Sequence, residues 1–425
     1  MRTGANWRSP ARLLACAAGL MLAPGIWAQQ QYDLLLKGAH VIDPKNSVNA
    51  TRDVAVQGER VAAVAANIPA NSARKTIDVS GLYLTPGLVD IHAHVAAGSR
   101  PGTTNLGQSS FFPDHLTFRT GVTTVVDPGS TGWRDFPEFR RNVIERARTR
   151  VLAMINIAGV GILSYELEQN VNDLIPEQAA RVAKENKDVV VGIKSAHWWA
   201  PNFVSVERAV EAGKLANIPV MVDFGYFLKE RPYSHMVTEI LRPGDMSTHC
   251  FRWPAPLLDE NGKPAEFLLQ ARRRGVKFDV GHGGGSFHFR LAEPLTKAGF
   301  YPDSISTDMH TQSMNHAMQD MPTTMSKFLA MGMPLVEVIR ASTTNPATQV
   351  LRPQLGQIGV GAEADIALLR LEKGSFGFSD VIGGKISGGE RLSCEMTIRA
   401  GRIVWDYNSR AAVPWREGKL KYPVK

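Results

Sequence analysis

Short apolar runs broken by turn residues occupy both ends of the chain. Between residue 31 and Val79, branched apolar residues alternate with stretches that contain glycine, proline and asparagine, and residues 396–405 repeat this pattern. Such runs are typical of β-hairpins. We expect residues 29–84 and 350–425 to meet in one small β-sandwich domain, with a tail at the C-terminus.

The middle of the chain alternates strand-like runs with apolar residues at helical spacing. The strand-like runs are Thr85–His94, Val122–Pro128, Val151–Ile157, Val189–Ser195, Pro219–Gly225, Met246–Phe251, Val276–Gly281 and Ser304–His310. The helical stretches include Phe136–Arg148, Pro176–Glu185, Val206–Ala216 and Ala265–Arg274. Eight strands alternating with helices predict an α/β fold, a (β/α)₈ TIM barrel over residues 85–349. Active-site groups in such barrels lie at the C-terminal ends of the strands.

The first 28 residues have the pattern of a secretory signal peptide. Basic residues precede the apolar run Leu13–Leu22, and small residues lead to a cleavage site after Ala28. The run is too short to remain as a membrane anchor. We expect a periplasmic or secreted protein, with lipidation at Cys16 as the alternative.

Composition narrows the class of protein. The chain has 425 residues, enough for a barrel and a smaller domain. Its net charge of +8 is spread along the chain without a basic stripe, so nucleic acid is not expected as a partner. No later segment is apolar enough for a stable membrane span. Cys250 and Cys394, the cysteines beyond the leader, are expected to be separate buried thiols rather than a disulfide.

The strongest chemical signal is a pair of histidines at the end of the first barrel strand. His92 and His94 are one residue apart. Because side chains alternate along a strand, both rings point the same way. Two converging imidazoles form half of a divalent metal site. The alternative is a pair of surface histidines.

A lysine ends the apolar strand Val189–Ser195. A buried lysine is costly unless it is paired or chemically changed. Desolvation lowers its pKa, and the neutral amine of Lys194 could add to carbon dioxide. The resulting carbamate has two oxygens that could bridge two metal ions. The alternative is an ion pair.

Four further polar residues follow apolar strands: Asp223, His249, His282 and Asp308. Carboxylates and imidazoles hold metal ions, and a catalytic site keeps an open position for water. Asp308 could also accept a proton and pass it to a leaving group. The set that could hold two divalent ions is His92, His94, Lys194, Asp223, His249 and Asp308.

These residues resemble the amidohydrolase superfamily, in its dihydroorotase-like and deacetylase-like branch. The string Pro-Gly-Leu-Val-Asp-Ile-His-Ala-His at residues 86–94 carries the resemblance, which extends from about Tyr32 to Trp405. It implies two divalent ions, of which zinc is expected. The implied roles are a first metal on His92 and His94, a bridging carboxylated Lys194, a second metal on His249, and Asp308 as ligand of the first metal and proton shuttle. Barrels of this kind commonly assemble through their helical faces, so a homo-oligomer is expected.

One position departs from the family pattern, because Asp223 stands where the family usually has a histidine. Three interpretations remain open. The carboxylate ligates the second metal, or holds it weakly and prefers a harder ion such as manganese. In the third, Asp223 does not ligate and the enzyme uses one metal.

Two segments predict contacts with substrate. The loop Gly281–Phe287 resembles the deacetylase-like branch, with His282 and Gly284 near the scissile group; the alternative is a tight turn with a structural histidine. Trp198, among the aromatic residues that follow Lys194, could line an apolar pocket or pack the rim. Tyr226 is a further candidate for contact with substrate. Weaker candidates are Arg231, His288 and His310. The histidines expected to have no catalytic role are His40, His115, His235 and His316.

The sequence therefore predicts a secreted metal-dependent hydrolase acting on carbon–nitrogen bonds other than peptide bonds, and on esters as an alternative. A metal-bound hydroxide would attack the carbonyl of a small molecule such as an N-acyl amino acid, with Asp308 as catalytic proton shuttle. One alternative is a cyclic-amide hydrolase of the dihydroorotase or hydantoinase type. Another is a non-catalytic relative that uses the barrel for binding.

Overall fold

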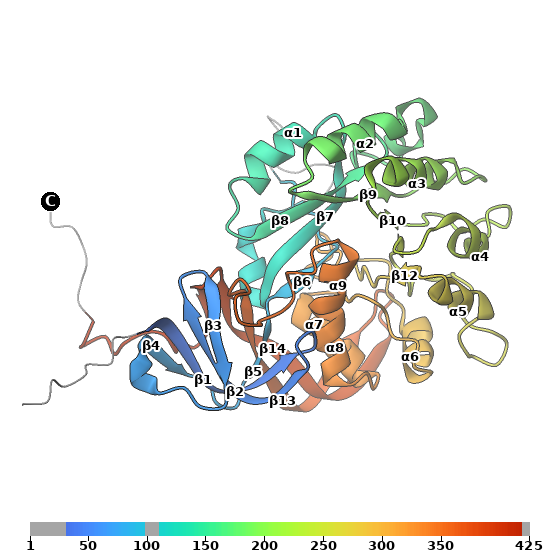
Figure 1. The fold of residues 1–425 in the computed structure, drawn as a ribbon. Coiled ribbons are helices and arrows are strands. Elements are labelled where there is room, and N and C mark those ends of the chain that lie inside the picture. The colour runs from blue at the N-terminus through green and yellow to red at the C-terminus, as the bar shows by residue number, and fades with distance from the viewer. Residues whose placement is uncertain (1–30, 98–109, 419–425) are drawn as a thin grey trace, which may run out of the picture.

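The computed structural model describes residues 31–97 and 110–418. The predicted signal peptide and Cys16 lie outside the described residues. Two sheets organise the chain, and helices accompany one of them (Figure 1).

The first sheet is built from both ends of the chain. Figure 1 shows its blue N-terminal strands beside orange-red C-terminal strands, as expected from the two hairpin-rich ends. The hydrogen-bonded order is β15-β14-β13-β5-β1-β2-β3, and β4 pairs with β1. Pairing is antiparallel except where β1 meets β4 and β5. The strands are β1 (Tyr32–Asp43), β2 (Val48–Gln57), β3 (Arg60–Ala65), β4 (Ala73–Asp78), β5 (Tyr83–Pro86), β13 (Ile366–Ser379), β14 (Lys385–Arg399) and β15 (Arg402–Asp406).

The second sheet is parallel, with seven strands in chain order. Its strands are β6 (Leu88–Asp90), β7 (Val122–Gly132), β8 (Arg150–Asn156), β9 (Val190–Ser195), β10 (Val220–Val222), β11 (Met246–Ser247) and β12 (Lys277–Phe278). Seven predicted runs therefore contain strands. The eighth run, Ser304–His310, makes single bridges instead, from Ser304 to Asp279 and from Met309 to Ala93.

Burial explains why the parallel strands are apolar. Every residue of β7 and of β9 is buried. Strands of a parallel sheet that are buried on both faces contain continuous apolar runs. A polar residue within such a strand, such as Lys194, is for that reason conspicuous.

The helices follow the parallel strands, and Figure 1 shows α1–α6 along the outer side of this sheet. The α-helices of the described residues are α1 (Phe136–Phe139), α2 (Pro176–Glu185), α3 (Val204–Ala216), α4 (Tyr233–His235), α5 (Glu266–Arg273), α6 (Phe289–Lys297), α7 (Met321–Ala330), α8 (Leu335–Ser342) and α9 (Thr344–Gln349). The predicted helix at Phe136–Arg148 is α1 followed by a π-helical turn at Arg140–Ile144. None of the helices in the described ranges is long and apolar enough to cross a bilayer.

Both cysteines of the described residues are buried and unpaired, which confirms the expectation of separate thiols. Burial raises the pKa of each thiol, to about 12 at Cys394. Neither is a reactive thiolate near neutral pH.

Strand β13 joins the two cores through the alternation of its side chains. Ile366 and Leu368 pack into the core of the mixed sheet, among residues such as Met396. Ala367 and Leu369 belong to the core formed with the parallel sheet and its helices. Because successive residues face opposite sides, one strand stabilises both layers.

Truncation on either face of β13 should therefore destabilise the protein. Leu368 and Leu369 are fully buried. We expect Leu368→Ala and Leu369→Ala each to lower the free energy of unfolding by about 2 to 5 kcal/mol. Urea unfolding measures the change. Val360→Ala, at a side chain that is 70% exposed, is the control and should change it by less than about 0.5 kcal/mol. A Leu369→Ala protein as stable as the control would contradict the assignment of this face to a core.

Candidate metal centre

The six predicted metal-binding side chains line one cavity of about 540 Å³. They come from the ends of β6, β9, β10 and β11 and from the segment that follows Ser304. Their convergence agrees with the rule that active sites lie at the C-terminal ends of parallel strands. The residues brought together are His92, His94, Lys194, Asp223, His249 and Asp308.

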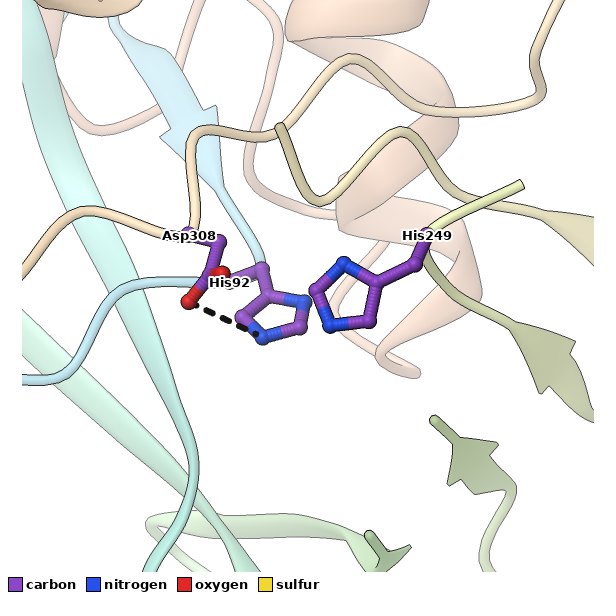
Figure 2. Close-up of side chains that lie close together, drawn as sticks. All are labelled: His92, His249 and Asp308. Atoms are coloured by element: carbon purple, nitrogen blue, oxygen red, sulfur yellow. Dashed lines mark ion pairs between the residues drawn. The ribbon is translucent and has the colours of Figure 1, made fainter. Parts of the chain in front are cut away.

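Asp308 lies beside both histidines of the His-x-His pair. Its Oδ1 atom is 3.5 Å from His92 Nε2 and 3.1 Å from His94 Nε2. Ligand atoms of His92, His249 and Asp308 all lie within 4.8 Å of one another (Figure 2). This group could hold a metal ion.

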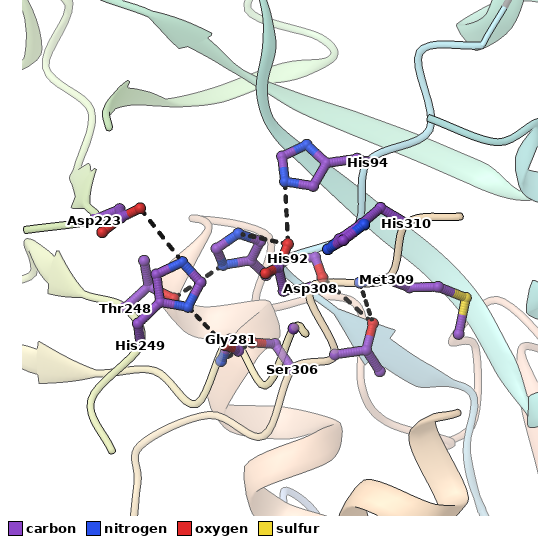
Figure 3. A network of polar contacts seen from close by, with 12 residues as sticks. His92, His94, Asp223, Thr248, His249, Gly281, Ser306, Asp308, Met309 and His310 are labelled. Atoms are coloured by element: carbon purple, nitrogen blue, oxygen red, sulfur yellow. Dashed lines mark hydrogen bonds and ion pairs between the residues drawn. The ribbon is translucent and has the colours of Figure 1, made fainter. Parts of the chain in front are cut away.

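Each of these imidazoles is fixed through Nδ1, and Figure 3 shows this contact for His92 and His249. The oxygens at hydrogen-bond distance are Thr248 Oγ1 for His92 (2.9 Å), Ser130 Oγ for His94 (2.8 Å) and the Gly281 carbonyl for His249 (2.6 Å). Metal-binding histidines characteristically bond their second ring nitrogen to such an oxygen. The Nε2 atoms remain available to a metal.

The spacing of these atoms fits a metal ion. Tetrahedral zinc with bonds of 2.0–2.2 Å holds its ligand atoms roughly 3.3 to 3.6 Å apart. The separation of 3.5 Å between Asp308 Oδ1 and His92 Nε2 falls in this range, and the 3.1 Å to His94 Nε2 is shorter and spans a hydrogen bond. Imidazole and carboxylate are both among the ligands that zinc takes in proteins.

Lys194 is buried in the wall of the cavity. Burial lowers its pKa, and the opposing charges of Asp223 and Asp308 do not restore it. Gly129, at φ +86°, makes room for this side chain, because an added Cβ would lie 2.8 Å from Lys194 Cβ. A buried amine of lowered pKa is the group that carbamate formation requires.

Asp223 uses its two oxygens differently. Oδ1 accepts hydrogen bonds from the Gly225 amide (2.8 Å) and from Arg252 Nη1 (3.1 Å). Oδ2 lies 3.6 Å from His249 Nε2 and accepts none of the side-chain hydrogen bonds found in the described ranges. One oxygen is held by donors while the other faces the cavity, an arrangement that favours the interpretation in which Asp223 ligates.

The charge states also suit metal binding. Burial lowers the pKa of His92 well below its usual value, and the nearby Lys194 adds to the effect. Burial acts to raise the pKa of Asp308, but the hydrogen bond and charge of His94 outweigh it and the pKa is lowered. A neutral imidazole and an ionised carboxylate are the forms that bind metal.

Glycines of the 281–285 loop divide into two kinds. At Gly281 an added Cβ would lie 2.4 Å from Thr248 Oγ1, and at Gly283 2.2 Å from Asp308 Oδ2. These two glycines let the loop pack against the metal-binding side chains. Gly284 and Gly285 have open space around an added Cβ and line the cavity, so Gly284 is placed for contact with a ligand.

His282 lies beneath this loop rather than on the cavity wall. Its ring stacks on Phe287 at 4.5 Å, and its Nε2 lies 2.7 Å from the Nζ of buried Lys327. The next residue, Gly283, packs closely against Asp308. His282 therefore supports the loop, while Gly284 faces the cavity.

The predicted aromatic contacts are also off the cavity wall. Trp198 is buried, and its Nε1 donates to Asn202 Oδ1 at 3.1 Å. Tyr226 is 47% exposed and packs edge-on against Trp199. Neither Trp198 nor Tyr226 is among the residues that line the cavity.

The remaining histidines and Arg231 fall into two groups. His310 and His316 line the cavity. The others have partners elsewhere: His288 accepts from the Trp253 amide, Arg231 donates to the Phe224 carbonyl, His40 bonds Asn49, and His115 and His235 contact Phe112 and Phe203.

The cavity also contains residues that sequence reasoning did not select. His197, Tyr165 and Arg252 line it, and buried Glu168 accepts from His197 Nδ1 at 3.0 Å. The position of His197, three residues beyond Lys194 at the same strand end, was an available signal. No sequence pattern connects it with Glu168.

Known proteins are similar to this chain over most of its length. Residues 286–404 match the amidohydrolase family. A deacetylase of Agrobacterium fabrum is 33% identical over 348 residues, 77% of this chain and 80% of that protein. A deacetylase of Enterococcus faecalis is 30% identical over 387 residues, 88% of this chain and 99% of that protein. This chain belongs to the amidohydrolase family.

Solved structures agree with that membership. The amidohydrolase chain superposes on a crystal structure of an adenine deaminase with a TM-score of 0.80 at 29% identity, covering 88% of this chain and 100% of the other. A dihydroorotase structure gives 0.76 at 27% identity, covering 88% and 99%. The predicted family is confirmed, and the protein is a metal-dependent enzyme of it.

The hydroxyl of Thr248 should control metal affinity in this amidohydrolase. It donates to Asp279 Oδ2 at 2.7 Å and lies 2.9 Å from His92 Nδ1. We expect Thr248→Val to weaken metal binding by about 10- to 100-fold, because the His92 ring loses its fixed orientation. Competition with a chromophoric chelator measures the affinity. Thr348→Val removes a hydroxyl that bonds only within its own helix and is the control. Equal affinities in the two variants would contradict this role.

Proposed function

We propose that this amidohydrolase is a secreted deacetylase that hydrolyses the amide, or the ester, of a small acylated molecule such as an N-acyl amino acid. The observation that carries the proposal is the convergence of six predicted metal-binding side chains on one cavity. The deacetylases that resemble the chain support the choice of an acetyl group.

The proposed cofactors are two divalent ions, zinc in the first instance, bridged by carboxylated Lys194. Lys194 would add as a neutral amine to carbon dioxide, forming a C–N bond and releasing one proton. His92, His94 and Asp308 would hold the first ion, and His249 with Asp223 the second. The free Nε2 atoms and the cavity-facing oxygen of Asp223 support this assignment.

Bound ions would make hydroxide available near neutral pH and polarise the substrate carbonyl. Residues of the protein would transfer the proton and position the substrate. Asp308, ionised and at the cavity surface, would take the proton of the attacking water on a carboxylate oxygen and deliver it to the leaving nitrogen or oxygen. Gly284 and Gly285 leave space for the acyl group beside this carboxylate.

The size of the cavity restricts the substrate. Its volume of about 540 Å³ lies within the range typical of small-molecule sites. Most of the residues that line the cavity are polar, and the lining also includes Tyr165 and Ile162. An acylated small molecule fits this description better than a polymer.

Several finer features of the fold and its context belong to the same proposal. The parallel sheet would belong to a closed (β/α)₈ barrel over residues 85–349. Closure is supported by the bridges of Ser304 to Asp279, which follows β12, and of Met309 to Ala93, which follows β6. The chain ends, residues 29–84 and 350–425, would form a β-sandwich. Cleavage of residues 1–28 would deliver the enzyme to the periplasm or medium, where it would assemble as a homo-oligomer.

A cyclic-amide hydrolase is the second candidate, supported by the likeness to a dihydroorotase structure at 27% identity. It would use the same metal-binding residues. The two candidates differ in whether the scissile amide belongs to a ring.

A substrate panel would separate these functions. The panel contains N-acetyl amino acids, an acetylated hydroxy acid, dihydroorotate, a hydantoin and adenine, each assayed before and after chelation. We expect turnover of the acetylated compounds, loss on chelation, and recovery with zinc. Asp308→Asn should lower kcat by about 10²- to 10⁴-fold because the proton shuttle is lost. Turnover of only the cyclic compounds or adenine, or a rate that survives chelation, would overturn the proposal.

Removal of Lys194 should remove the bridge between the two ions. We expect Lys194→Ala to lose most of its metal and its activity, since the carbamate would supply the two oxygens that bridge the ions. Elemental analysis of the purified protein measures the metal. Lys184→Ala, at an exposed position of α2, is the matched control. Full metal content and activity in Lys194→Ala would show that the lysine does not bridge.

A further inference from the structure

His197 occupies a position in the cavity wall that none of the predicted roles explains. It follows β9 three residues after Lys194, and it lines the same cavity as the metal-binding side chains. Its Nδ1 is 3.0 Å from Glu168 Oε1, and its Nε2 is 3.4 Å from Asp223 Oδ2. The ring therefore has one nitrogen held by the protein and one directed to a carboxylate of the site.

The same arrangement occurs at the first metal position. There Asp308 Oδ1 has two imidazole nitrogens close by, His94 Nε2 at 3.1 Å and His92 Nε2 at 3.5 Å. Asp223 Oδ2 likewise has His197 Nε2 at 3.4 Å and His249 Nε2 at 3.6 Å. Each cavity-facing carboxylate oxygen is thus accompanied by two imidazole Nε2 atoms.

The distances around Asp223 are better explained by a metal ion than by hydrogen bonds. Hydrogen bonds between nitrogen and oxygen span about 2.7 to 3.2 Å. Ligand atoms around tetrahedral zinc are roughly 3.3 to 3.6 Å apart. The separations of 3.4 and 3.6 Å fall in the second range.

Glu168 gives His197 the environment of a metal ligand. Glu168 is buried, and its only side-chain hydrogen bond within the described ranges is the one to His197. A carboxylate behind a histidine fixes the tautomer with Nε2 free and increases the donor strength of the ring.

The backbone of His197 also resembles that of two predicted ligands. His197, His249 and Asp308 have φ values of +51°, +56° and +49°, in the left-handed region that non-glycine residues avoid. Among cavity-lining residues such strain is typical of functional positions, where it aims a side chain.

We infer that His197 is a ligand of the second divalent ion, together with His249 and the Oδ2 atom of Asp223. This assignment rests on the metal centre of the proposed function. The family resemblance places a histidine where this chain has Asp223, and His197 supplies the missing imidazole from the end of the neighbouring strand. The second site then has two imidazoles and an additional carboxylate.

Metal content tests this assignment independently of activity. Wild type, His197→Ala and His316→Ala are dialysed against buffered zinc, and the ions per chain are measured by elemental analysis. We expect two ions in wild type, one in His197→Ala and two in His316→Ala. His316 is the matched control, because it is an exposed histidine that lines the same cavity.

A compensating variant tests whether His197 replaces the imidazole absent at position 223. In the His197→Ala background, Asp223→His should restore the second ion, since it returns a ring to the end of β10. A double variant that still binds one ion would contradict the replacement.

A more conservative substitution tests the assignment if His197→Ala does not fold. Glu168→Gln keeps the shape of the side chain and the ring of His197, but loses the charge behind it. We expect the second ion, and not the first, to bind about 10- to 100-fold more weakly. Circular dichroism checks that the variant is folded, and an unchanged second affinity would overturn the assignment.

The outcomes also separate this inference from the proposed function. Two equally tight ions in both wild type and His197→Ala would overturn the inference alone. A single ion in wild type, with metal-dependent hydrolysis retained, would overturn the inference and the two-ion cofactor, and would leave the proposed hydrolytic activity standing. A wild type without bound metal and without hydrolysis would overturn both.

Discussion

The hydrogen bond to Nδ1 of each imidazole is the interaction on which the metal centre depends. It fixes the ring plane and the tautomer, so that Nε2 faces the cavity with a free electron pair. The partner atoms come from other strands than the histidines they hold: Thr248 follows β11 and bonds His92 beyond β6, and Gly281 follows β12 and bonds His249. The centre is therefore assembled by contacts between strand ends, and its geometry requires the sheet to be formed (Figure 3).

Buried carboxylates extend this network to the segment that follows Ser304. Asp279 accepts from Ser304 Oγ at 2.6 Å and from Ser306 Oγ at 2.8 Å, in addition to Thr248. Asp90 accepts from the Thr307 amide, and burial raises the pKa of Asp90 to about 7. Backbone hydrogen bonds also hold this segment, since the amides of Val280, His282 and Gly283 donate to the carbonyls of Ser304, Ser306 and Thr307. The same bonds position Asp308 at the end of the segment.

The mixed sheet from the two chain ends contributes to the cavity as well. The turn between β13 and β14 brings Val381 to the cavity wall, where its amide donates to the Phe287 carbonyl at 3.2 Å. Asp380 accepts from the Phe289 amide at 3.1 Å, at the start of α6. These contacts clamp the glycine-rich loop between the two sheets. A substitution in the mixed sheet can therefore alter the side of the cavity where Gly284 lies.

The sequence alone determined the residue types of the centre and most of the elements that carry them. Apolar runs ending in His92, Lys194 and Asp223 predicted buried parallel strands with polar ends, because a buried strand tolerates a polar side chain only at its edge or with a partner. Local patterns also predicted α2 and α3 closely. What only the tertiary structure decided was the set of partners. Glu168 meets His197, and Lys327 meets His282, across 29 and 45 residues of chain. Such contacts depend on how loops pack over the strand ends. A sequence pattern shows the spacing of residues along one helix or strand, but it does not show which two segments come into contact.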